Sequence, residues 1–218
     1  MAVSMKVLSN NAEWLLKRKN KIGGSDASCI VGMNPYKTNI ELWEEKTGRR
    51  VAPDISNEPY VKYGHDAEKY LRKLFAIDYP QYQVLYEENN MWLNDNYPFA
   101  HASLDSWLID EDGRKGVLEI KTTNILQSMQ KEKWKDRIPD NYYIQVLHYL
   151  MVTEFEFAIL KAQLKYEHNN GDVFLTTKHY KIERAEVEED IEYLESAERR
   201  FYEYIINDRQ PNLVLPAI

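Results

Sequence analysis

The chain has 218 residues, of which 44% are hydrophobic and 29% are charged, and its formal net charge is -7. This length and composition predict one globular domain with a sizeable core. No apolar run is long enough to span a bilayer and no signal-peptide pattern opens the sequence, so we expect no membrane partner. The single cysteine, Cys29, excludes an internal disulfide and a cysteine zinc cluster and fits a reducing cytoplasm. The acidic balance argues against general DNA affinity, unless basic groups line a local substrate path.

The first third of the chain reads as helical. Asn10 or Asn11 can cap the first helix, in which Trp14 and Leu15 are expected to face inward. A flexible loop, Gly-Gly-Ser-Asp at 23–26, precedes the second helix. Hydrophobic spacing and turn residues together predict helices at about 10–18, 27–31, 38–48 and 58–77.

The rest of the chain alternates strands with helices. Strands are expected at 82–88, 91–93, 102–110, 116–123, 155–164 and 173–182. Helices are expected at about 125–134, 139–152 and 185–207, and a loop at 168–171 joins the last two strands. This order predicts the mixed α/β class, with a central mixed sheet flanked by helices.

The strands at 102–110 and 116–123 form a hairpin whose register decides where its charges lie. A three-residue loop, 111–113 with a left-handed Gly113, pairs residue 105 with residue 119. Because side chains alternate along a strand, this register puts Asp105, Glu119 and Lys121 on one face. An apolar face is then made by Leu104, Leu108, Leu118 and Ile120.

Two carboxylates and a lysine therefore converge at one end of the hairpin. Carboxylate oxygens suit a hard cation such as Mg2+ or Mn2+. Lys121 can orient or deprotonate a water from the same face. The pattern D-(x13)-E-x-K resembles the core of the PD-(D/E)xK nuclease superfamily, with Leu104 where that name has proline. Taken alone, this pattern is also compatible with a solvated hairpin edge that holds an ion pair.

Five further motifs occur in the order typical of one family. They are Trp14, Arg18, Ser25 and Asp26 (W-x3-R-x6-S-[DE]), Tyr63-Gly64 with Glu68, Ser103 with Asp105, Leu118-Glu119-Ile120-Lys121, and Tyr143-Ile144-Gln145-Val146 followed by Tyr149. Together they resemble the YqaJ-like viral recombinases, a family related to the phage lambda-type exonuclease. The resemblance covers about residues 14–152 and implies a restriction-endonuclease-like core.

The resemblance also implies roles for individual residues. Asp105, Glu119, the Ile120 carbonyl and Glu68 would hold metal ions, Lys121 would serve the attacking water, and Gln145 would help to position water or substrate. Arg18, Ser25 and Ser103 would contact phosphate, since arginine offers bidentate donors and serine one hydroxyl. Each has a plainer interpretation too: Glu68 as a solvated helix residue, Gln145 as a core amide, and Asp26 as a helix cap. His65, His101 and His148 are expected to be structural.

The implied function is a Mg2+-dependent DNA exonuclease of phage or prophage recombination, with Mn2+ as a substitute. Related enzymes degrade the 5′ strand of linear double-stranded DNA and leave 3′ tails for a phage single-strand annealing protein. The resemblance further implies a homotrimer in the cytoplasm of a bacterial host. We expect a single nuclease domain over 1–218, divided into N-terminal helices (1–78), catalytic sheet and helices (79–183) and a C-terminal helix (184–218). A related endonuclease or nickase, or a non-catalytic DNA-binding module, are the alternatives.

Overall fold

The computed structural model describes residues 3–19, 21–126, 128–167 and 171–215. The helices within these ranges are α1 (Asn11–Lys19), α2 (Gly24–Ile30), α3 (Asn39–Lys46), α4 (Pro59–Asp78), α5 (Ser128–Lys133), α6 (Asp140–Thr153) and α7 (Glu188–Ile206). The strands are β1 (Val3–Val7), β2 (Gln83–Leu85), β3 (Asn90–Asn94), β4 (Ser106–Ile109), β5 (Lys115–Ile125), β6 (Phe157–Glu167) and β7 (Val173–Glu183). Of the loop expected at 168–171, positions 168–170 lie outside the described residues. None of the described helices has the length and apolar character needed to span a bilayer.

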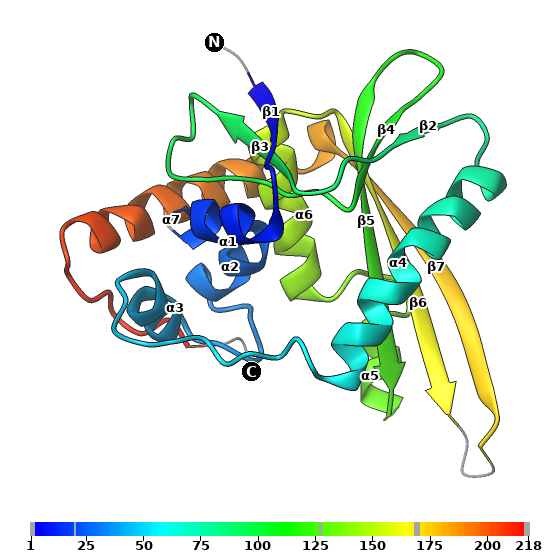
Figure 1. Ribbon diagram of the computed structural model, residues 1–218, viewed down its shortest axis with the longest axis horizontal. Coiled ribbons are helices and arrows are strands. Elements are labelled where there is room, and N and C mark those ends of the chain that lie inside the picture. Colours follow the sequence, from blue (N-terminus) through cyan, green and yellow to red (C-terminus); the bar gives the residue numbers. More distant parts are fainter. Residues whose placement is uncertain (1–2, 20, 127, 168–170, 216–218) are drawn as a thin grey trace.

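Five strands form the central sheet in the order β2-β4-β5-β6-β7. Only the β5–β6 pair is parallel in this sheet, and the other neighbours are antiparallel. A parallel pair needs a crossover connection, and here α5 and α6 supply it. Figure 1 shows α4 on one side of the sheet and α2, α3, α6 and α7 on the other. The prediction of a mixed sheet flanked by helices is confirmed.

The β4–β5 hairpin has the register expected from the sequence. Ser106 pairs with Leu118 and Ile109 with Lys115, which places residue 105 opposite residue 119. Asp110 and Arg114 close the turn by a main-chain hydrogen bond of 3.1 Å, and Gly113 has the left-handed φ of +80°. The three-residue loop is therefore confirmed.

Each face of the sheet is covered by its own apolar cluster. Leu108, Leu118 and Ile120 pack with Leu71 and Phe75 of α4, as the predicted apolar face requires. The prediction for Leu104 is wrong, because its side chain joins the cluster on the opposite face. The cause is that β4 begins only at Ser106, so alternation along that strand does not fix residue 104. The face that carries Glu119 is itself buried, under α6 and α2.

The N-terminal region differs from the sequence prediction in three places. Leu15 is exposed (54%) rather than inward, although Asn10 caps α1 as expected. Helix α2 begins at Gly24, inside the predicted loop, and the Asp26 carboxylate accepts a hydrogen bond of 3.0 Å from the main-chain N–H of Gly23. The segment expected to feed the hairpin, 91–93, instead pairs with β1 in a separate two-stranded sheet. Strand β1 was not predicted from the sequence, because its five residues, Val-Ser-Met-Lys-Val, form a short and partly polar segment.

A fully buried ion pair joins α6 to α7. The two ring nitrogens of His148 lie 2.7 Å from Glu198 Oε1 and 2.9 Å from the main-chain oxygen of His101. Both partners accept hydrogen bonds, so both nitrogens donate. Burial by itself lowers the pKa of His148, but the Glu198 carboxylate outweighs it and raises that pKa above its ordinary value. His148 and His101 are core residues, and the structural interpretation of these two histidines fits their burial.

Candidate active site

Asp105 is the last residue before β4, at the mouth of the hairpin. Its Oδ2 atom accepts a hydrogen bond of 2.8 Å from the main-chain N–H of Ile120 on the neighbouring strand. This bond ties the carboxylate to β5 next to Glu119. Burial raises the pKa of Asp105, although Lys121 and the Ile120 N–H act in the opposite direction. The sheet register thus produces a close pair of carboxylates.

Glu119 lies in the middle of β5 and is 1% exposed. Its Oε1 atom accepts hydrogen bonds from Lys121 Nζ at 2.6 Å and from Gln145 Nε2 at 3.0 Å. Its Oε2 atom is buried and has no hydrogen-bond partner among the described residues. Burial first, and then the neighbouring Asp105, raise the pKa of Glu119 to about 8. A buried carboxylate with a free oxygen is costly unless a cation or donor completes it.

Lys121 and Gln145 come from β5 and α6. Burial by itself lowers the pKa of Lys121, but Glu119 and Asp105 outweigh it and hold the ammonium in its charged form. The Lys121 ammonium also lies 5.1 Å from the centroid of the Tyr142 ring. Gln145 donates a second hydrogen bond, 2.7 Å long, to Tyr149 OH. Both side chains are therefore fixed around one oxygen of Glu119.

Glu68 reaches the site from α4, but its carboxylate pairs with Arg72 one turn further along the helix. Burial, and then the nearby Asp105 carboxylate, raise the pKa of Glu68. Arg72 is held in turn by the Tyr86 ring, 3.5 Å from its guanidinium carbon. Glu68 therefore lies near Asp105, although its carboxylate already forms an ion pair with Arg72.

The upstream motif residues lie next to the acidic side chains and line the same cavity. Trp14 Nε1 donates to Ser103 Oγ at 3.1 Å, and the Arg18 guanidinium lies 4.0 Å from the centroid of the Trp14 ring. Ser25 is exposed in the first turn of α2. The spacing of this motif therefore reflects one tryptophan that positions both a cation and a hydroxyl.

A cavity of about 580 Å³ brings these groups together. Its lining includes Arg18, Ser25, Glu68, Ser103, Asp105 and Gln145. Glu119 and Lys121 lie directly behind the lining, linked to it through Gln145. The structure thus collects every side chain expected at the site in one place. His65 also lines the cavity, at an exposed position.

The residues fit a hard divalent cation. Asp105 and Glu119 offer oxygen ligands, one of them the unpartnered Oε2, and burial raises the pKa of both carboxyls. Such crowding of negative charge is relieved by a bound cation. In the described part of the chain, no three His, Cys, Asp or Glu side chains are already arranged as a metal cluster. The pair Asp105–Glu119 is thus the preformed part of the candidate site.

Two residues that position the site could not be assigned from the sequence. The side chain of Asn90 donates to Leu104 O (2.8 Å) and accepts from Leu104 N (2.9 Å), which clamps the backbone between Ser103 and Asp105. Tyr149 lies one turn after Gln145 on α6, and its hydroxyl accepts the Gln145 hydrogen bond. What the sequence does not indicate is that the Tyr149 ring packs against Gly24 of α2. No sequence signal distinguishes Asn90 from other polar residues in strands and turns.

Comparison of the sequence with known proteins identifies a matching family. The family described as YqaJ-like viral recombinase domain matches residues 13–156. An uncharacterized protein YqaJ of Bacillus subtilis (strain 168) is 34% identical over 157 residues. That stretch covers 69% of this chain but 46% of the relative, so the chain spans about half of that protein's length. The resemblance found in the sequence motifs is confirmed.

Solved structures share the fold. An alkaline exonuclease (LHK-Exo) from Laribacter hongkongensis superposes with a TM-score of 0.62, covering 91% of this chain and 95% of that one, at 17% identity. A phage related exonuclease from Haemophilus somnus 129PT gives 0.56, covering 86% and 96%, at 15% identity. At these identities the likeness establishes the fold alone, and it agrees with the predicted mixed sheet flanked by helices.

Gly24 offers a test of how α2 supports the site. A Cβ atom at this position would lie 2.5 Å from the Tyr149 ring and 3.0 Å from Gln145 Cγ, closer than packed atoms allow. We predict that Gly24→Ala lowers the free energy of unfolding by about 1–3 kcal/mol, the usual effect of overpacking. Thermal or denaturant unfolding measures this.

Gly64→Ala is the matched control, since a Cβ in that helix would meet only Thr122 Oγ1 at 3.1 Å. An alanine in a helix interior is favoured over glycine by about 1 kcal/mol. We therefore expect Gly64→Ala to be neutral or stabilising. A Gly24→Ala protein as stable as wild type would contradict the tight α2–α6 contact.

Proposed function

Because the chain belongs to the YqaJ-like viral recombinase family, we propose that it is a metal-dependent deoxyribonuclease that degrades the 5′ strand of linear duplex DNA. The family and the fold indicate a nuclease. The observation that carries the proposal is the convergence of Asp105, Glu119 and Lys121 beside the Arg18, Ser25 and Ser103 wall of one cavity. A binding module gains nothing from buried carboxylates placed next to phosphate.

In this proposal Asp105, Glu119 and the Ile120 carbonyl hold Mg2+, or Mn2+ in its place, and Glu68 adds a further carboxylate. When bound, such a cation stabilises charge on the phosphate and makes water a better nucleophile. The protein itself orients the two carboxylates. Gln145 fixes the rotamer of Glu119, and the Ile120 N–H fixes that of Asp105, so the two carboxylates are held before substrate arrives.

The cationic and hydroxyl groups act on the phosphate and on the attacking water. Lys121 carries donors beside Glu119 and orients the water or stabilises the developing negative charge. Across the cavity, Arg18 can clamp a phosphate through two parallel N–H donors. The hydroxyls of Ser25 and Ser103 each add one hydrogen bond. The groups proposed to bind phosphate and those proposed to serve its attack thus meet in one cavity.

We further propose one nuclease domain over residues 1–218 that acts in the bacterial cytoplasm as a homotrimer. Its product, a 3′ single-stranded tail, would pass to a phage single-strand annealing protein. The support for these statements is family membership, and the match is to only part of the relative's length. The trimer and the annealing partner are therefore proposals for the whole protein.

The proposed function is tested on two DNA substrates. We expect wild-type protein with Mg2+ to release nucleotides from end-labelled linear duplex and to leave closed circular plasmid intact, with no cleavage in EDTA. Nicking or linearisation of circles would instead identify a related endonuclease or nickase. Absence of metal-dependent loss of either substrate would favour a DNA-binding module.

The two buried carboxylates give the sharpest variants. We predict that Asp105→Asn or Glu119→Gln lowers Mg2+-dependent cleavage by about a hundredfold or more, since loss of even an indirect ligand contact costs about 10–100-fold. Glu68→Gln should have a smaller effect, because the Glu68 carboxylate is already paired with Arg72. Cleavage rates and DNA binding in EDTA are measured together.

Glu111→Gln, an exposed carboxylate in the turn of the same hairpin, is the control and should cleave as wild type. Unfolding curves of each variant establish that the protein is folded. Wild-type cleavage rates in folded Asp105→Asn or Glu119→Gln protein would exclude this site.

Recognition of a DNA end is the property that separates exonuclease from endonuclease. We predict that wild type digests 5′-phosphorylated ends about tenfold or more faster than 5′-hydroxyl ends, because a charge-assisted hydrogen bond is worth roughly 1.5–3 kcal/mol. Arg18→Ala should remove most of this difference. Lys17→Ala, an exposed neighbour on α1 that does not line the cavity, should keep it. Equal wild-type rates on both ends would rule out a terminal-phosphate site.

A further inference from the structure

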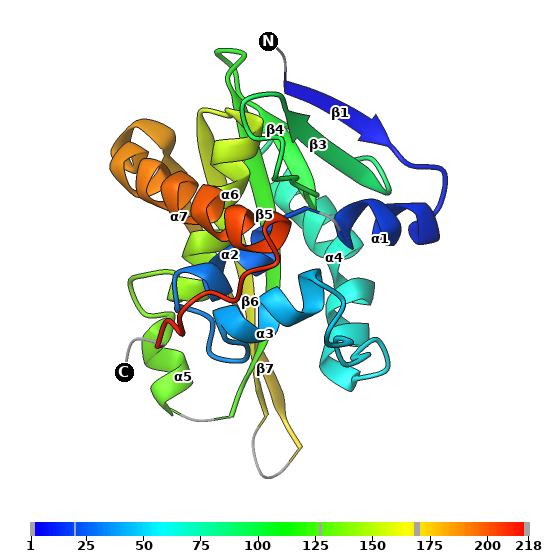
Figure 2. The same cartoon turned by 90° about the vertical axis from the view of Figure 1, so that its left-hand side faces the viewer.

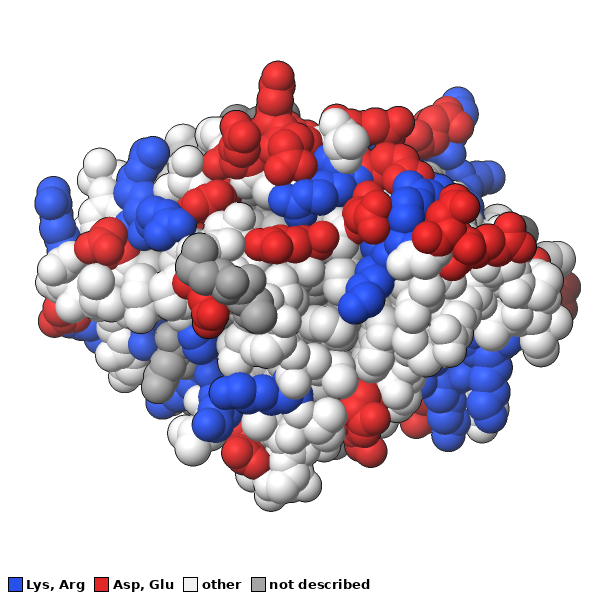
Figure 3. All heavy atoms as spheres, turned by 90° about the horizontal axis from the view of Figure 1, so that it is seen from above, with Lys and Arg blue, Asp and Glu red and all other residues white. Residues whose placement is uncertain are grey.

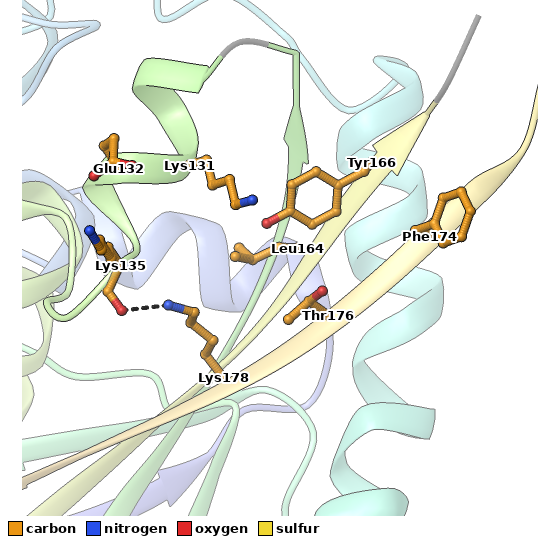
Figure 4. A pocket seen from close by; sticks show the side chains of 8 residues that line it. All are labelled: Lys131, Glu132, Lys135, Leu164, Tyr166, Phe174, Thr176 and Lys178. Carbon is orange, nitrogen blue, oxygen red and sulfur yellow. Dashed lines mark hydrogen bonds between the residues drawn. The ribbon is translucent and has the colours of Figure 1, made fainter.

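A second cavity, of about 600 Å³, lies between α5 and the β6–β7 hairpin. Figure 4 shows Lys131 and Lys135 on one side of it and the Tyr166 ring across from Lys131. Three lysines and one glutamate, Glu132, line it together with aromatic and apolar side chains. Its lining is therefore net positive, although the whole chain carries a net charge of -7.

The cavity lies on the same sheet face as the candidate active site. Lys121 pairs with Ala162, and Ala162 pairs with Lys178; cross-strand partners point to one face. Lys178 is therefore in the row of Lys121, two strands away, at about 10 Å by the usual strand spacing. Leu164 and Thr176, one row further along, are also in the lining. One nucleic-acid strand can reach both places.

The lysines of this cavity differ in what they can bind. Lys178 donates to the main-chain oxygens of Trp134 and Lys135, so it fixes the chain that follows α5. Lys131 and Lys135 are exposed, and neither forms an ion pair with a described residue. The Lys131 ammonium lies 5.8 Å from the centroid of the Tyr166 ring. Two exposed cations, of which Lys131 lies beside an aromatic ring, are thus available to a ligand.

From this arrangement we propose that the cavity binds single-stranded DNA next to the active site, with Lys131 and Lys135 on its phosphates and Tyr166 against a base. Cationic grooves with aromatic rings bind single strands in this way, with little sequence preference. The proposal rests on the proposed nuclease function for its substrate class. The cavity would keep the enzyme on one strand between successive cleavage events.

The test measures binding without cleavage. Anisotropy of a fluorescein-labelled oligothymidylate is titrated in EDTA, at several salt concentrations, with wild type and the double variant Lys131→Ala/Lys135→Ala. We expect affinity at low salt to fall about tenfold or more. The slope of log affinity against log salt should shrink by about 1.4, since each phosphate contact on a single strand contributes about 0.7. The control, Lys73→Ala/Lys133→Ala, removes equal charge from exposed positions outside the cavity and should bind as wild type.

Two further variants separate the aromatic from the ionic contribution. Tyr166→Leu keeps an apolar side chain but removes the stacking surface, so it should weaken binding at every salt concentration without changing the slope. Thr176→Glu places a negative charge at an exposed position of the lining and should weaken binding without disturbing the core. The Thr176→Glu result therefore stands even if the Tyr166 variant folds poorly.

The outcomes of this binding test can be told apart from those of the cleavage test of the proposed nuclease function. Wild-type protein that cleaves linear duplex, together with a Lys131/Lys135 variant that binds the oligonucleotide as tightly as wild type, overturns this proposal and leaves the nuclease standing. Cavity-dependent binding by a protein that cleaves no DNA overturns the nuclease alone. A wild type that binds no oligonucleotide but captures a phosphopeptide through the cavity also overturns the proposal.

Discussion

The closeness of two carboxylates, Glu119 fully buried and Asp105 half-buried, is the constraint on which the site depends. Asp105 and Glu119 lie against a sheet face that is otherwise packed with apolar side chains. An isolated buried carboxylate is strongly unfavourable, and two together repel each other. The fold compensates with an N–H of Ile120, the amide of Gln145 and the ammonium of Lys121. Oε2 of Glu119 is left without a partner among the described residues, and the proposed cation would complete it.

The elements around the sheet are placed by this requirement. Helix α6 must bring Gln145 onto β5, and α2 packs closely on α6 because Gly24 has no side chain to hold them apart. Figure 1 shows α1 and α2 on the α6 side of β5, and Figure 2, which looks onto that side, shows α1 below β1 and β3. That position lets Trp14 and Ser103, which are 89 positions apart in the sequence, meet beside the carboxylates. Segments distant in the chain thus form the part of the cavity that is proposed to bind phosphate.

Much of this could be predicted from local sequence, and what could not has a physical reason. The hairpin register was predictable because a three-residue turn with a left-handed glycine leaves one pairing that puts Asp105 and Glu119 together. The inward face of α1 was not predictable, because a short helix packed through Trp14 alone leaves Leu15 exposed. The pairing of β1 with β3 depends on non-local contacts that neither strand encodes. Likewise, the clamp by Asn90 on Leu104 follows from the position of β3, whereas Lys121 and Glu119 are linked by strand alternation alone.

The distribution of charged side chains is compatible with DNA as the proposed substrate, although the chain as a whole is acidic. Figure 3 shows acidic and basic side chains interspersed on the face seen from above, so a broad positive field does not cover that face. General attraction to phosphate falls steeply with salt, and this surface offers little of it. Cations are placed instead at defined points: Arg18 stacked on Trp14 at the cavity wall and Lys121 paired with Glu119 behind it. In the proposed function, these fixed cations would hold phosphate where the carboxylates already lie, so that DNA binding depends on a few placed side chains and not on a general positive surface.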